Sequence, residues 1–255
     1  MRILGPATAL MLVAAVAAGC GGVVDGTAKP APNLKPRPLT GDTVRRVLLD
    51  GDVLSRMLNQ PFATRKPAEF GGPGVLSQKD ETVSPANCLG VTAMLQKSVY
   101  QSADVKDVAA QAWWNNGDPA QVISVIEGVV ALPSAAQAQA LFAQFSQQWQ
   151  QCNGTTTTEQ NGPISTTIVI GDVRIPDASK TIVAATNTAT SVLPNMPPLR
   201  PTPQARAIGV QLNCLVEVEV VFFGDRRPSD PGSGNLDTSG IDVARAMMDK
   251  VSALS

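Results

Sequence analysis

The chain has 255 residues, of which 44% are hydrophobic, 4% aromatic and 16% charged, and its formal net charge is −1. This composition is typical of a globular protein, and it favours neither nucleic acid nor an anionic membrane surface as a partner. The chain contains no histidine. That excludes Ser-His-Asp and Cys-His nucleophiles and histidine-containing metal sites, so we expect no metal and no cofactor.

The first twenty residues have the pattern of a bacterial lipoprotein signal. One basic residue, Arg2, precedes an apolar run that ends in small residues at positions 17–19 and then in Cys20. In such signals a diacylglycerol is attached to the cysteine thiol and the chain is cut before it. A transmembrane helix is the alternative, but the apolar run of residues 3–19 is shorter than the ~20 residues of a bilayer span. We expect a signal peptide over residues 1–19 and a lipid anchor on Cys20.

A tether and one folded domain are expected after the signal. Residues 20–38 contain several prolines and glycines and few large apolar side chains, which is typical of a flexible linker. Residues 39–255 are enough for one sizeable hydrophobic core. We expect this domain to lie on the extracytoplasmic face of the cell membrane.

The first part of the domain combines helical and irregular segments. Apolar residues recur at helical spacing over residues 39–59, with Asp52 as the expected cap of the second half and Pro61 ending the helix. Residues 64–86 contain a Gly-Gly-Pro-Gly sequence and little periodicity, so we expect a loop. Residues 88–96 are compatible with a short helix.

The centre of the chain predicts a strand followed by a helix. Residues 122–132 are rich in β-branched side chains and precede Pro133, which ends the strand. Ser134 starts the best-defined helix of the chain. Its apolar face consists of Ala138, Leu141, Phe142, Phe145 and Trp149, the last of which we expect to be a core anchor.

Further strands and a closing helix complete the domain. The predicted segments are strands at residues 155–158, 164–170, 181–186 and 206–223, a loop at 224–234 and a helix at 237–254. In the last of these strands, Cys214, Val216 and Val218 fall on one face, and Glu217 and Glu219 fall on the other. Strands in hairpin succession flanked by helices predict an α+β fold on an antiparallel sheet.

Five short segments carry a resemblance to a known family. They are residues 88–91 (Cys-Leu-Gly-Val), 99–102 (Val-Tyr-Gln-Ser), 112–117 (Ala-Trp-Trp-Asn-Asn-Gly), 130–138 (Val-Ala-Leu-Pro-Ser-Ala-Ala-Gln-Ala) and 148–154 (Gln-Trp-Gln-Gln-Cys-Asn-Gly). In this order they resemble the PknH-like extracellular sensor domain family of mycobacterial kinases and stand-alone lipoproteins. The resemblance implies a single domain with a twisted antiparallel sheet, helices packed against it and a wide cleft for an unidentified extracytoplasmic ligand. It implies no enzyme activity, and the chain lacks the motifs of a kinase domain.

The resemblance also implies a disulfide between Cys88 and Cys152. The positions of the family's second disulfide fall near Gln204 and Val221, and neither is a cysteine in this chain. Cys214 shares a strand face with apolar residues, so we expect a free, buried thiol there. A Cys152–Cys214 disulfide is the alternative pairing.

Trp113 and Trp114 are the candidate ligand-binding aromatics. As neighbours on an extended segment they should face opposite ways, one toward the core and the other toward the cleft. Asn115 and Asn116 should then lie near the cleft rim. The alternative is a packing motif that ends in an Asn-Gly turn.

Two other segments could carry function. Glu217 and Glu219 could serve as an acid and a base or hold a hard cation, but we expect a solvated sheet face because nothing else in the sequence converges there. The proline-rich residues 193–203 could be a recognition element, but we expect a stiff loop between strands.

The sequence therefore predicts a cell-envelope lipoprotein with a non-catalytic, sensor-like domain. Its partners would be the membrane, through the lipid on Cys20, and an envelope ligand that is a lipid, a glycan or a peptide. A structural or protein-interaction role is the main alternative. A carboxylate-based hydrolase is a further alternative.

Overall fold

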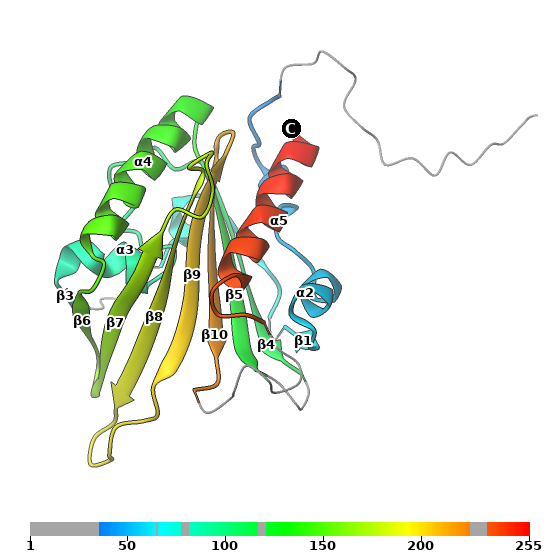
Figure 1. The fold of residues 1–255 in the computed structure, drawn as a ribbon. Coiled ribbons are helices and arrows are strands. Elements are labelled where there is room, and N and C mark those ends of the chain that lie inside the picture. The colour runs from blue at the N-terminus through cyan, green and yellow to red at the C-terminus, as the bar shows by residue number, and fades with distance from the viewer. Residues whose placement is uncertain (1–35, 65, 78–81, 117–120, 225–233) are drawn as a thin grey trace, which may run out of the picture. The chain divides into compact units, whose positions relative to one another are not determined.

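The computed structural model describes residues 36–64, 66–77, 82–116, 121–224 and 234–255, and residues 34–255 form one compact unit. Within the described residues, ten strands form one antiparallel sheet (Figure 1). The strands are β1 (Phe62–Ala63), β2 (Glu69–Gly71), β3 (Thr82–Ser84), β4 (Asp107–Asn115), β5 (Val122–Ala131), β6 (Thr156–Asn161), β7 (Ile164–Arg174), β8 (Ile182–Val192), β9 (Thr202–Gln211) and β10 (Cys214–Phe222). Their order is β1-β4-β5-β10-β9-β8-β7-β6-β3, and β2 also pairs with β4.

Helices cover both faces of this sheet (Figure 1). They are α1 (Asp42–Arg45), α2 (Gly51–Leu58), α3 (Leu89–Thr92), α4 (Ala135–Gln151) and α5 (Ser239–Leu254), with 3-10 turns at Pro73–Val75 and Ala86–Cys88. On β10, Val216 and Val218 belong to the core under α1, α2 and α5, whereas Leu215 belongs to the core under α3 and α4. The central strands bury side chains on both faces, which explains why their sequences are almost continuously apolar.

Helix α4 forms where the sequence predicts it. Ser134 caps its N-terminus by accepting a hydrogen bond from the backbone N–H of Gln137, at 3.3 Å. Its predicted apolar face is buried, and Trp149 is 1% exposed. The α+β fold, the antiparallel sheet and the role of Trp149 as a core anchor are therefore confirmed.

Several predicted boundaries are wrong for local reasons. Asp50, not Asp52, caps α2, because its extended backbone lets the side chain accept from the N–H of Val53 at 2.8 Å. The expected loop at residues 64–86 contains two short strands of the sheet, β2 and β3. Of the expected helix at residues 88–96, only the α3 turn forms.

The expected single strand at residues 206–223 is a hairpin of two strands. β9 ends at Gln211, and Leu212 takes a left-handed backbone with φ 51° before β10 starts at Cys214. Apolar residues recur at every second position from Val210 to Phe222, so the sequence alternation continues through the two-residue turn and hides it. As a result Val210 lies in the core under α4, on the opposite face from Cys214.

Residues 1–35 lie outside the described part, and with them the expected signal peptide, Cys20 and most of the tether. So does most of the expected loop at residues 224–234. Among the described helices, none has the length and apolar character needed to cross a membrane.

Candidate functional site

A cleft of about 600 Å³ opens on the face of the sheet that also carries α4. Helix α4 packs on one end of the strands, near Ile208 and Val210, and the cleft occupies the part of this face beyond the helix. Its floor comes from β4 to β10, including Ala112, Ile126 and Ala189, and residues 92–96 form one of its walls. A volume of this size is typical of a small-molecule site.

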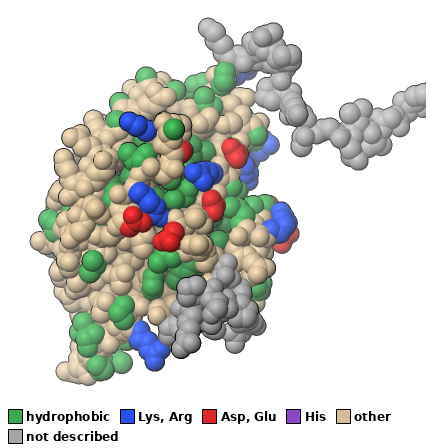
Figure 2. Space-filling model, viewed as in Figure 1, with side chains coloured by type: hydrophobic (Ala, Val, Ile, Leu, Met, Phe, Trp, Pro, Cys, Tyr) green, Lys and Arg blue, Asp and Glu red, His purple; other side chains and the backbone are tan. Residues whose placement is uncertain are grey.

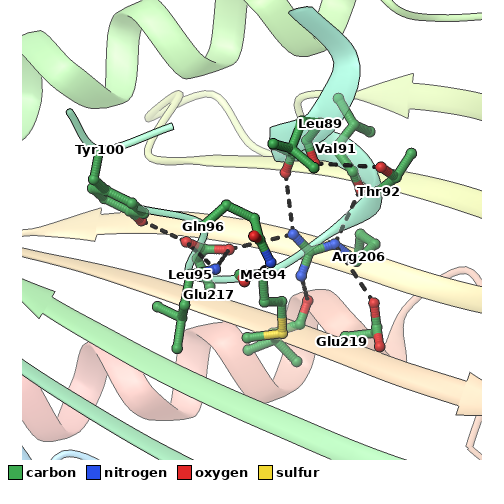
Figure 3. Close-up of polar contacts among 12 residues, drawn as sticks. Leu89, Val91, Thr92, Met94, Leu95, Gln96, Tyr100, Arg206, Glu217 and Glu219 are labelled. Atoms are coloured by element: carbon green, nitrogen blue, oxygen red, sulfur yellow. Dashed lines mark hydrogen bonds and ion pairs between the residues drawn. The ribbon is translucent and has the colours of Figure 1, made fainter. Parts of the chain in front are cut away.

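Arg206 of β9 is the buried cation beside this cleft (Figure 3). Its guanidinium donates hydrogen bonds to the carbonyl oxygens of Gly90 and Val91, at 3.2 and 3.1 Å, and to that of Val218, at 3.3 Å. It also lies 5.6 Å from the centre of the Trp149 ring. The side chain therefore ties the α3 segment to the middle of the sheet.

Glu217 of β10 is the carboxylate that pairs with Arg206. It lies 3.3 Å from the guanidinium Nη2 and accepts from the Tyr100 hydroxyl at 2.5 Å and from the Leu95 N–H at 3.3 Å. Burial, and then the charge of Glu217, hold the pKa of Tyr100 well above its usual value, so the tyrosine keeps its proton and donates it. Glu217 is 3% exposed, and its oxygens are fully used within the protein.

Glu219 lies two residues further along β10, on the same face, and it does line the cleft. The nearest atom of Arg206, Nε, is 4.0 Å from its carboxylate, too far for a hydrogen bond. Burial raises the pKa of Glu219, against the opposing effect of Arg206. Next to it on the floor, the side-chain Oε1 of Gln204 is buried and accepts no hydrogen bond from the described residues.

The expectation of a solvated sheet face at Glu217 and Glu219 is therefore wrong. The α3 segment and Tyr100 cover this face, and Arg206 on the neighbouring strand supplies the charge that lets carboxylates be buried there. An arginine inside the apolar run of residues 205–210 was the sequence signal for this network. Among the described residues, no group of three or more cysteine or acidic side chains is arranged to hold a metal ion.

The wall of residues 92–96 is fixed at several points. Leu95 has a left-handed backbone with φ 53°, and its side chain lies over Gly128 of β5, where an added Cβ would come within 2.8 Å of it. Its carbonyl accepts from the N–H of Ser77 at 2.8 Å. A disulfide between Cys88 and Cys152 joins the chain just before this wall to the end of α4. The cleft wall is thus attached to the sheet and to a helix.

The structure confirms the predictions for the three cysteines of the domain. The Cys88–Cys152 disulfide is present, with an S–S distance of 2.09 Å, and the alternative Cys152–Cys214 pairing is wrong. Cys214 is a free thiol under α5, and burial raises its pKa to about 12. It is therefore a small apolar side chain of the core rather than a reactive group.

Comparison with known proteins decides the family. The model of the PknH-like extracellular domain family matches residues 39–250. This chain belongs to the PknH-like extracellular domain family. A search of curated protein sequences finds no match.

Among solved structures, one extracellular domain shares the fold of this chain. The crystal structure of the extracellular domain of PknH from Mycobacterium tuberculosis superposes with a TM-score of 0.66 at 19% identity, over 85% of this chain and 98% of that one. An uncharacterised protein from Mycobacterium smegmatis gives a TM-score of 0.40 at 12% identity, over 83% of this chain and 96% of that one. At this identity, the first likeness shows that the two domains share a fold.

Trp113 and Trp114 of the PknH-like domain do face opposite sides of the sheet. Trp113 packs against the core on the α5 side and lines a separate hollow of about 520 Å³, whereas Trp114 is 37% exposed on the other side. Neither they nor Asn115 and Asn116 line the 600 Å³ cleft, since its lining on β4 ends at Ala112 and Trp113 faces the opposite side of the sheet. A ligand role for these four residues stays a prediction, without support from the cleft.

A second buried carboxyl, Glu127 of β5, lies on the α5 side of the PknH-like domain. It is 0% exposed, and its Oε2 accepts from the N–H of Leu49 at 2.7 Å. Burial raises the pKa of Glu127 to about 8, although the Leu49 N–H, Lys250 and the nearby Trp113 indole oppose the rise. Glu127 is therefore largely protonated at neutral pH.

We expect Glu127→Gln to make stability less sensitive to pH. The folded protein holds the Glu127 proton up to about pH 8, whereas an unfolded chain releases it near 4.5, so the native protein loses stability as pH rises between these values. Glutamine mimics the neutral acid. In urea denaturation from pH 5 to 9, the free energy of unfolding of the variant should rise relative to that of the native protein, by at most about 1.4 kcal/mol per pH unit. The exposed Asp104→Asn is the control, and parallel curves for Glu127→Gln and the native protein would contradict the prediction.

Proposed function

We propose that this chain is a cell-envelope lipoprotein whose PknH-like domain binds a ligand in the 600 Å³ cleft without transforming it. One observation carries the proposal: the cleft floor presents Glu219 and the buried Oε1 of Gln204, and no described residue satisfies either with a hydrogen bond. A buried acceptor without a donor, such as Gln204 Oε1, is costly, and a ligand that supplies a donor to it and to the partly exposed Glu219 would offset this cost. The membership of the chain in an extracellular domain family supports a role outside the cytoplasm.

The arrangement of carboxylates argues against the hydrolase alternative. An acid and base pair would need two carboxyl groups that reach one substrate. Glu219 lines the cleft, but Glu217 does not, and its oxygens are already bound to Tyr100, Leu95 and Arg206. Glu69 and Glu159 also line the cleft, but Glu69 is paired with Lys66 and Glu159 also has a partner. This arrangement and the absence of histidine suit binding better than catalysis.

A protein-interaction role has one observation in its favour. Val192, Met196 and Leu199 are exposed apolar side chains in and beside the proline-rich segment, and Leu199 also lines the cleft. A partner could therefore contact the mouth of the cleft. On the face drawn in Figure 2, charged side chains of both signs are interspersed with hydrophobic ones, which does not favour a nucleic-acid partner.

Ligand binding is tested by a thermal-shift screen of residues 34–255 against envelope lipids, glycans and peptidoglycan fragments. A ligand at a hundred times its dissociation constant stabilises the folded state by about 2.7 kcal/mol. Ala189→Phe, which places a ring on the cleft floor, should abolish the shift. Ala140→Phe, on the exposed side of α4, should leave it unchanged. Ligands that stabilise both variants equally would show that the cleft is not the site.

The lipid anchor is tested on the full chain. Mass spectrometry of the membrane fraction should find a diacylglyceryl group on an N-terminal Cys20, since small residues precede this cysteine and the apolar run before it is short. Cys20→Ala should remove the modification. Native protein that remains in the membrane with its first nineteen residues uncut would instead indicate a transmembrane anchor.

A further inference from the structure

The donors of Arg206 do not reach Glu219. The guanidinium gives its N–H groups to three backbone carbonyls and to Glu217, which leaves Glu219 with a charge at 4.0 Å and no hydrogen bond. Figure 3 shows Glu219 on the other side of the guanidinium from Glu217. The network therefore contains one cation and two carboxyl groups, and the second carboxyl faces the cleft.

The cleft around Glu219 has a polar part and an apolar part. Gln204 on β9 adds a second buried acceptor to the polar part of the floor. Ala110 and Ala112 of β4, Ile126 of β5 and Met94 of the wall make the other part apolar. An anionic group placed beside Glu219 and Gln204 would meet a carboxyl and an amide oxygen, so this part of the floor disfavours anions. Two cationic side chains, Lys66 and Arg200, also line the cleft, and Lys66 is paired with Glu69.

We propose that the cleft takes an amphiphile whose head group donates hydrogen bonds and carries no negative charge, either a polyhydroxyl group or an ammonium. The head donates to Glu219 and Gln204, and the apolar part lies along Ala112 and Ile126. This inference rests on the proposed function, because it names the class of ligand for the same cleft. Both head groups donate hydrogen bonds. They differ in charge, so the charge of Glu219 should affect the binding of an ammonium more than that of a polyhydroxyl group.

The test compares three eight-carbon probes that differ only in the head group: octyl glucoside, octylammonium and octanoate. Each is titrated below its micelle concentration into residues 34–255, and binding is followed by calorimetry and by NMR of the probe. We expect one or both donor probes to bind and octanoate to bind at least about tenfold more weakly, which is the effect of one hydrogen bond to a charged group. Octanoate binding as tightly as the donor probes would overturn the inference.

Two variants of Glu219 locate the contact. Glu219→Leu removes the acceptor and should weaken the binding of each donor probe that binds by about tenfold or more. Glu219→Gln keeps an acceptor but removes the charge, so it should weaken octylammonium and leave octyl glucoside within about threefold. Both variants must unfold with the native cooperativity, and Asp104→Asn is the matched surface control. Unchanged affinity in Glu219→Leu would overturn the inference.

The outcomes separate this inference from the proposed function. If octanoate binds the native protein tightly but does not bind Ala189→Phe, the head-group inference is overturned while the cleft remains a ligand site. Donor probes that bind equally to Ala189→Phe would place them outside the cleft and would contradict both.

Discussion

Replacing both cysteines of the disulfide, in Cys88→Ala/Cys152→Ala, should lower the free energy of unfolding by about 4 kcal/mol. The bond joins residues 64 apart in the sequence, and a loop of this length restricts the unfolded chain strongly. Both half-cystines are buried, so the loss acts on the core under α4. Urea denaturation of the native protein with and without a reductant should reproduce the same difference.

Cys214→Ala is the control for this experiment. Its thiol is free, so this variant should respond to the reductant in the same way as the native protein. The disulfide also fixes the chain just before the cleft wall. The double variant should therefore lower the affinity for any ligand whose binding Ala189→Phe abolishes. A native protein whose unfolding is unaffected by the reductant would contradict the prediction.

Arg206→Met should lower the free energy of unfolding by about 3–5 kcal/mol. The substitution removes the cation that is 3.3 Å from Glu217 and 4.0 Å from Glu219, and it leaves both carboxyl groups buried without a partner charge. It also removes the guanidinium donor of the Gly90 carbonyl oxygen and one of the two side-chain donors of the Val91 carbonyl oxygen, which keeps Asn187. Denaturant unfolding followed by far-UV circular dichroism measures the loss.

A rescue experiment distinguishes buried charge from lost packing. Adding Glu217→Gln and Glu219→Gln to Arg206→Met removes the uncompensated charges and should recover a large part of the stability. Arg174→Met is the matched control, because its ion pair with Asp172 is partly exposed and should cost less than about 1 kcal/mol. A triple variant no more stable than Arg206→Met would show that the charges are not the cause.

Features that depend on short segments could be predicted from the sequence. The apolar stripe of α4 and its Ser134 cap specify a helix without reference to the rest of the chain. The Cys88–Cys152 pairing followed from a family resemblance rather than from the spacing of the cysteines. The sequence does not reveal the hairpin, because Leu212 is a non-glycine residue with a left-handed backbone and the turn residue Asn213 lies within an unbroken apolar alternation.

The site depended on information that a linear pattern does not carry. The alternation of valine and glutamate in β10 has the same period whether its polar face meets water or a buried arginine. Only the pairing of β10 with β9 brings Arg206 beside Glu219, and only the wall around Leu95 covers them. The sequence favours Trp113 and Trp114 as ligand-binding residues because they are aromatic, but the end of β4 at which they lie is outside the cleft.

The position of β10 has a consequence for the order in which the molecule can form. This strand is the last in the sequence, yet it pairs with β5 on one side and β9 on the other, so it alone joins β4 and β5 to β6–β9. Asn213, just before it, also holds Leu39 at the start of the domain through hydrogen bonds of 2.8 and 2.9 Å. During synthesis, the residues that precede β10 can therefore build two partial sheets but not the native one. The ten-stranded sheet therefore cannot close before β10 has been synthesised, which places its completion at a late stage of synthesis.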